Sequence, residues 1–140
     1  MIVKQVSVFV ENTVGRLAGL TKILAENDID LKASTIAETV DFGILRCIVE
    51  DPEKTVKILI ENGFTASLSE VIGVSLEDKA GGLHHVLALL ADAGIAVNYI
   101  YSTIKSAEGK AIIMMKVADS DKAVEVLKSS GVELVGVESL

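Results

Sequence analysis

Two glycine-containing turns hold the residue types that could do chemistry. The first, Glu11–Leu17, reads Glu-Asn-Thr-Val-Gly-Arg-Leu, and the second, Glu77–Leu83, reads Glu-Asp-Lys-Ala-Gly-Gly-Leu. Glycine lets the backbone turn sharply, so that the N–H groups of a following helix can meet an anion such as a carboxylate. Asn12 or Asp78 could orient the amine of a ligand. Any strand-to-helix turn favours glycine with Asn or Asp, so a purely structural explanation also stands.

Other polar residues have simpler explanations. Arg16 could clamp a carboxylate or phosphate, although a single surface arginine is usually solvated. His84 and His85 have no ligand cluster at a convincing spacing and are expected to be solvated helix residues. Cys47 falls on an apolar strand face, which favours a small buried side chain over a nucleophile. Asn98 is harder to explain by packing and is kept as a candidate binding residue.

Several function classes are disfavoured by composition. The 140 residues carry a net charge of −7, with no Trp, two Tyr and three Phe, which argues against nucleic-acid binding. Neither an apolar run of ~20 residues nor a signal peptide is found, which predicts a cytoplasmic protein with no membrane partner. No Ser-His-Asp set, Cys-His set, paired carboxylates or Walker loop is present, so we expect neither an enzyme nor a cofactor or metal.

The elements that position these turns occur twice. When the sequence is compared with itself at an offset of 66 residues, Gly15 aligns with Gly81 and Leu17 with Leu83. After about residue 40 the offset becomes 68, and Gly63 aligns with Gly131. The two extra residues are expected around Lys105 to Gly109. The chain therefore divides into two predicted domains, 1–70 and 71–140.

Each repeat predicts the same order of elements. Alternating apolar residues give a strand before each turn, and apolar residues at helical spacing follow it. We expect second strands from Ile29 and Ile95, third strands over 42–49 and 111–117, helices capped by Asp51 and Asp119, and last strands from Phe64 and Val132. The order βαββαβ, twice, predicts an α+β fold of two tandem ferredoxin-like units, each an antiparallel sheet with helices on one face.

The third strand of each repeat is apolar on both faces. In the first repeat Leu45 and Cys47 face the helices, while Phe42, Ile44 and Ile48 lie on the opposite face. A sheet that is apolar on both faces needs a second cover. The pattern, together with a mean hydropathy of +0.49, predicts association into a homodimer, with pairing of the units within or between chains left open.

Both halves of the sequence resemble ACT domains. The resemblance rests on Asn12–Leu17 leading into Thr21–Ala25 and Asp28–Leu31, on Asp41–Arg46, and on Asp78–Leu83 with Gly94–Asn98. It covers essentially the whole chain. It implies small-molecule sensing, most often of amino acids, at interfaces between paired domains.

The resemblance also implies which residues contact the ligand. The first strand-to-helix turn of one domain would bind the ligand carboxylate, and the start of the second strand of a partner domain would face it. The residues carried over are Asn12, Val14, Gly15, Arg16, Leu17, Asp30 and Leu31 in the first repeat, and Asp78, Ala80, Gly81, Gly82, Leu83, Ala96, Val97 and Asn98 in the second. Asp78 replaces Asn12 and Ala96 replaces Asp30, so the two sites differ.

Three functions stay open at this point. The first is an amino-acid-binding regulatory protein that acts by coupling ligand binding to assembly. The second is a regulatory subunit or interaction protein of a separate biosynthetic enzyme such as acetolactate synthase. The third, a small hydrolase of the acylphosphatase kind, shares the βαββαβ order but is supported by Arg16 alone.

Overall fold

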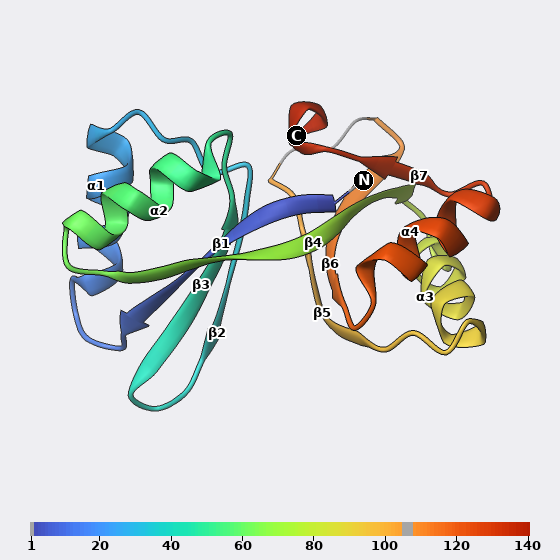
Figure 1. Ribbon diagram of the computed structural model, residues 1–140, viewed down its shortest axis with the longest axis horizontal. Helices are drawn as coiled ribbons and strands as arrows, with labels where there is room; N and C mark the ends of the chain where they lie inside the picture. Colours follow the sequence, from blue (N-terminus) through green and yellow to red (C-terminus); the bar gives the residue numbers. More distant parts are fainter. Residues whose placement is uncertain (1, 105–107) are drawn as a thin grey trace. The chain divides into compact units, whose positions relative to one another are not determined.

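The chain folds as two compact units in a computed structural model that describes residues 2–104 and 108–140 (Figure 1). One unit is Lys4–Ser69, and the other is Glu70–Leu140 together with the first residues of the chain. Residues 105–107, part of the segment expected to hold the two extra residues of the second repeat, lie outside the described residues.

The first unit follows the predicted βαββαβ order. Its elements are β1 (Ile2–Glu11), α1 (Arg16–Glu26), β2 (Ala33–Glu38), β3 (Phe42–Ile48), α2 (Pro52–Glu61) and the beginning of β4 (Thr65–Glu77). The strands lie in the order β2-β3-β1-β4. Strand β3 is antiparallel to both β1 and β2, with Val6 opposite Cys47 and Ala33 opposite Ile48.

The second unit repeats this arrangement. It uses the end of β4, then α3 (Gly82–Asp92), β5 (Val97–Ser102), β6 (Lys110–Val117), α4 (Ser120–Ser129) and β7 (Glu133–Val135), followed by a 3-10 turn (Val137–Ser139). Strand β4 pairs antiparallel with β6 and β7, and β5 pairs antiparallel with β6. In each unit both helices lie on one side of its strands (Figure 1). The α+β fold with antiparallel sheets is therefore confirmed.

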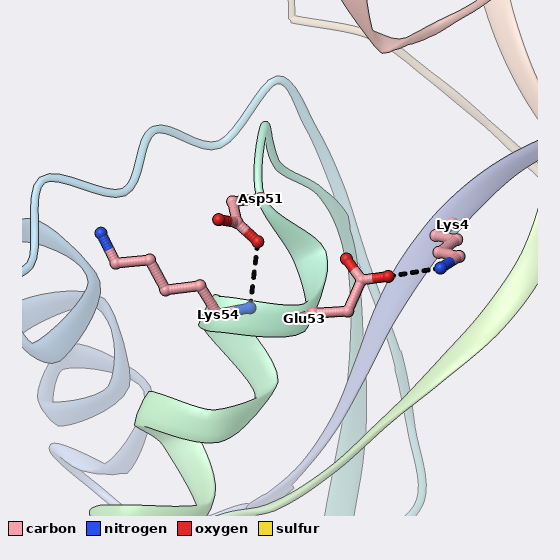
Figure 2. Close-up of polar contacts among 4 residues, drawn as sticks. All are labelled: Lys4, Asp51, Glu53 and Lys54. Carbon is pink, nitrogen blue, oxygen red and sulfur yellow. Dashed lines mark hydrogen bonds and ion pairs between the residues drawn. The ribbon is translucent and has the colours of Figure 1, made fainter.

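The predicted N-terminal caps of α2 and α4 are confirmed by hydrogen bonds from the helix backbone. The Asp51 carboxylate accepts a hydrogen bond from the backbone N of Lys54 at 3.1 Å (Figure 2). Asp119 caps α4 in the same way, by accepting from Lys122 N. Such caps satisfy N–H groups that the helix cannot pair internally. Figure 2 also shows Lys4 of β1 paired with Glu53 in the first turn of α2.

Each unit has its own core between sheet and helices. In the first unit it contains β-strand residues such as Val8 and Leu45 with Leu20 and Leu59 from the helices. The second core contains strand residues such as Val74 and Met115 with Leu90 and Leu127 from the helices. The side of β3 that carries Leu45 and Cys47 is buried, as the alternation predicts.

The second strands begin later than predicted. β2 starts at Ala33 rather than Ile29, and β5 starts at Val97 rather than Ile95. The backbone N–H of Ile29 instead closes the end of α1 by donating to Leu24 O at 2.9 Å. Asp30 and Leu31 consequently precede β2 rather than begin it.

The face of β3 away from the helices is unevenly exposed. Phe9 and Phe42 remain 48% and 37% exposed, with ring centroids 5.3 Å apart. Ile48 on the same face of β3 is fully buried, as is Met114 of β6. The first unit therefore presents an exposed aromatic pair.

Candidate ligand-binding turns

The two glycine turns have the same backbone conformation. Gly15 has φ 85° and ψ −9°, and Gly81 has φ 87° and ψ −9°, in the left-handed region that favours glycine. Each glycine is the N-cap of the helix that follows, and neither helix has a side-chain cap. The N–H of the first residue of each helix donates within its turn, from Arg16 N to Thr13 O at 3.3 Å and from Gly82 N to Lys79 O at 3.0 Å. Because a helix also leaves its next N–H groups unpaired internally, both turns offer donors to an anionic ligand.

The first turn is held by contacts within its own unit. Asn12 donates from its backbone N to Asp41 O at 3.0 Å and from Nδ2 to Val40 O at 3.4 Å. Arg16 pairs through Nε with Oε2 of Glu11 at 2.5 Å. That hydrogen bond is the main cause of the lowered pKa of Glu11. The side chains expected to orient a ligand thus already have protein partners.

Arg16 makes a second contact, with an aromatic ring. Its Cζ atom lies 3.9 Å from the centroid of the Phe64 ring. This distance is suitable for a cation–π interaction. Phe64 is 5% exposed and packs in the core of the first unit. The arginine side chain therefore covers the space between the start of α1 and the residue before β4.

The second turn differs from the first in its charged side chains. Lys79 pairs with Oε2 of Glu77 at 2.6 Å, and Asp78 N donates to Gly109 O at 3.1 Å. The hydrogen bond from Lys79, helped by the charges of Lys79 and Lys110, holds the pKa of Glu77 below its ordinary value. The same pair raises the pKa of Lys79. Glu77 is thus ion-paired with Lys79, and the charge of Lys110 adds a smaller effect.

A cavity of about 470 Å³ lies beside this second turn. It is lined by the start of α3, the end of β4, the start of β6, and the connection from α4 to β7. The lining residues are Ser75, Leu76, Glu77, Lys79, Gly81, Gly82, His85, Val86, Lys110, Ser130, Gly131, Val132 and Glu133. Of the predicted binding residues, the cavity brings together Gly81 and Gly82.

Several lining residues were missed by sequence reasoning. Lys110 and Glu133 stand at the starts of strands far along the chain from the turn, where no local motif marks them. The repeat itself held the signal, because the shifts of 66 and 68 place Gly82 against Arg16 and Val132 against Phe64. Smaller residues in the second repeat predict an open space there.

The remaining predicted residues lie elsewhere in their units. Leu17 and Leu31 line a cavity of about 320 Å³ beside β2, and Asp30 lines another of about 330 Å³. Asn12, Val14 and Gly15 of the first turn are exposed, as are Asp78 and Ala80 of the second, with Leu83 partly buried in α3.

The two halves of the predicted second site are separated within their own unit. Ala96, Val97 and Asn98 follow α3, whereas Gly81 precedes it. Across the β6 ladder Glu77 lies opposite Lys110 while Val97 lies opposite Val117, at the other end of that strand. A single unit therefore does not unite the two halves.

The other reactive side chains behave as expected. Burial raises the pKa of the Cys47 thiol to about 12, and its side chain is 1% exposed. His84 and His85 are exposed on α3.

Among residues 2–104 and 108–140, no group of three or more His, Cys, Asp or Glu side chains could hold a metal ion. In the same residues no helix is long and apolar enough to cross a membrane.

Comparisons with known proteins show which family and fold the chain resembles. The family described as "ACT domain pair" matches residues 1–140. The crystal structure of protein BT0572 from Bacteroides thetaiotaomicron is 41% identical, covers 96% of this chain and 92% of that chain, and has a TM-score of 0.91. No curated protein sequence matches the chain.

More distant structures share the fold. The regulatory subunit of aspartate kinase from Thermus thermophilus, in its ligand-free form, is 14% identical over 91% of each chain, with a TM-score of 0.67. The corresponding subunit from Thermus flavus is also 14% identical, covering 91% of this chain and 90% of that one, with a TM-score of 0.63. At such identity the likeness concerns the fold alone.

Proposed function

Because the chain belongs to the ACT domain pair family, we propose that it is a non-catalytic regulatory protein that binds an amino acid. The observation that carries the proposal is the pair of uncapped helix N-termini behind Gly15 and Gly81, which have the same left-handed conformation. Donors arranged in this way suit a carboxylate. The fold shared with two aspartate kinase regulatory subunits supports a regulatory role.

The proposed site uses two surfaces. The turns, Asn12–Leu17 and Asp78–Leu83, would contact the ligand carboxylate, with each turn in one of the proposed domains 1–70 and 71–140. Residues 30–31 and 96–98 would face a turn from a paired ACT domain. Pairing in a homodimer would supply such a partner, and coupling between ligand and assembly would transmit the signal in the cytoplasm.

Calorimetry with each proteinogenic amino acid tests this function. We expect heat of binding for at least one of them. Gly81→Asp places a carboxylate where the ligand carboxylate would lie, and Gly15→Asp does the same in the first turn. Gly81→Asn and Gly15→Asn are matched controls, because they impose the same backbone strain without the charge. If the folded protein gives no heat of binding with any of the amino acids, the function is rejected.

A second candidate is a regulatory subunit of a separate biosynthetic enzyme. The exposed pair Phe9 and Phe42 favours it, because aromatic residues are enriched at the centres of protein interfaces. Capture from a native extract separates the two functions. Wild type should retain an enzyme that the Phe9→Ser variant loses, and recovery of the homodimer alone would count against this candidate.

A further inference from the structure

We propose that each chain has one amino-acid site, in the cavity of the second unit, and that Arg16 and Phe64 close the corresponding space in the first. This inference rests on the proposed function and narrows it to one of the two turns. It adds Lys110 and Glu133 to the residues that would recognise the ligand.

The first unit fills the space with its own side chains. The Arg16 guanidinium lies over Phe64 and is also paired with Glu11. Its position is fixed by two partners of different chemistry, a ring and a carboxylate. A ligand entering beside the first turn would have to displace this cation and expose the face of a core phenylalanine.

The second unit lacks both side chains. Gly82 replaces Arg16, and Val132 replaces Phe64. A Cβ on Gly82 would lie only 2.2 Å from the backbone O of Glu77. The start of α3 therefore approaches the end of β4 too closely for any side chain at this position, and the neighbouring space remains as the cavity of about 470 Å³. This volume is typical of small-molecule sites.

The charges that line the cavity suit a zwitterion. Lys79 and Lys110 supply two positive charges and Glu77 and Glu133 supply two negative ones, with His85 alongside. Glu77 is already bound to Lys79. The backbone N of Gly82 already donates to Lys79 O at 3.0 Å. Lys110 is then placed to receive a carboxylate, and Glu133 to receive an ammonium group. A cavity with balanced charge favours a molecule that carries both groups over a dianion or a polyamine.

The first unit does not carry these charges at the corresponding positions. The shift of 68 places Phe42 against Lys110 and Thr65 against Glu133. Phe42 instead contributes to the exposed aromatic pair with Phe9. The two repeats have therefore diverged both in the space beside the turn and in the charges around it.

Calorimetric titration of the wild-type chain and four variants tests the assignment, with the proteinogenic amino acids as ligands. Val132→Phe fills the cavity with the side chain found in the first repeat, and Lys110→Met removes the cation. Their matched controls are Phe64→Val in the first unit and Lys57→Met on the exposed side of α2. We expect one ligand per chain for wild type. Both cavity variants should weaken binding at least about tenfold, and both controls should not.

The outcomes separate this inference from the function on which it rests. Two ligands per chain, or unchanged binding in Lys110→Met, would overturn the site while leaving amino-acid binding intact. Absence of binding to the folded wild-type chain would reject the function itself. Thermal melting reports whether Val132→Phe folds; if it does not, Lys110→Met, a change at an exposed residue, decides the test.

Discussion

Arg16 and Phe64 form a cation–π pair between the first residue of α1 and the residue before β4, with Cζ 3.9 Å from the ring centroid. The pair joins two segments that are distant in sequence. It also distinguishes the first repeat from the second, where glycine and valine occupy these positions.

Replacing the arginine should weaken the first unit modestly. Arg16→Ala removes the contact with Phe64, so we expect the free energy of unfolding to fall by about 1 kcal/mol. Urea denaturation measures the change. Lys22→Ala on the same helix is the control, because its pair with Glu26 is exposed and 3.8 Å long. Equal effects of the two variants would show that the ring contact contributes nothing.

Gly82 should be intolerant of even one added carbon. Its Cβ would lie 2.2 Å from Glu77 O, so Gly82→Ala should destabilise by about 1–3 kcal/mol. Helix propensity alone would favour alanine by about 1 kcal/mol. Gly136→Ala is the control, because the atoms nearest to its Cβ would belong to the movable carboxylate of Glu138. A Gly82→Ala variant as stable as wild type in urea would contradict the close approach of α3 to β4.

The carboxyl of Glu77 should titrate at lower pH than an ordinary glutamate. Its pKa is lowered from 4.5, so its contribution to stability is present above that value and is lost as pH falls through the folded-state pKa. Lys79→Met should raise the pKa of Glu77 toward 4.5. Side-chain NMR titration measures this shift, and Lys79→Arg should keep the pKa low. No change in Lys79→Met would assign the shift to another group.

The thiol of Cys47 should be inert in the folded protein. Its pKa of about 12 leaves little thiolate at neutral pH, and its side chain is buried. A thiol-reactive dye should label it only in denaturant. Rapid stoichiometric labelling under native conditions would show that β3 opens.

The doubled fold could be predicted from the sequence because its signals are local. Helix caps such as Asp51 and turn glycines such as Gly15 act within a few residues. The start of β2 could not be found in this way. Ile29 and Leu31 continue the apolar alternation and pack against the first core, although the backbone pairing begins only at Ala33. Side-chain alternation extends beyond the paired strand.

The candidate site likewise combines residues that a local sequence signal marks with residues that only the packing brings together. The turns around Gly15 and Gly81 carry a local signal, and their matching conformation follows from it. The contact between Arg16 and Phe64, and the presence of Lys110 beside α3, depend on packing between distant segments. No spacing within one turn encodes those contacts.

Strand β4 has a consequence for how the chain can be cleaved. It runs without a break from Thr65 to Glu77, so the last strand of one repeat continues directly as the first strand of the next. Proteases cleave exposed loop tips more readily than paired strands. Val14 and Val40, at 107% and 90% exposure, lie in such tips inside the first repeat. Limited digestion should therefore nick the first repeat internally before it separates the two, and intact single repeats should not accumulate as fragments.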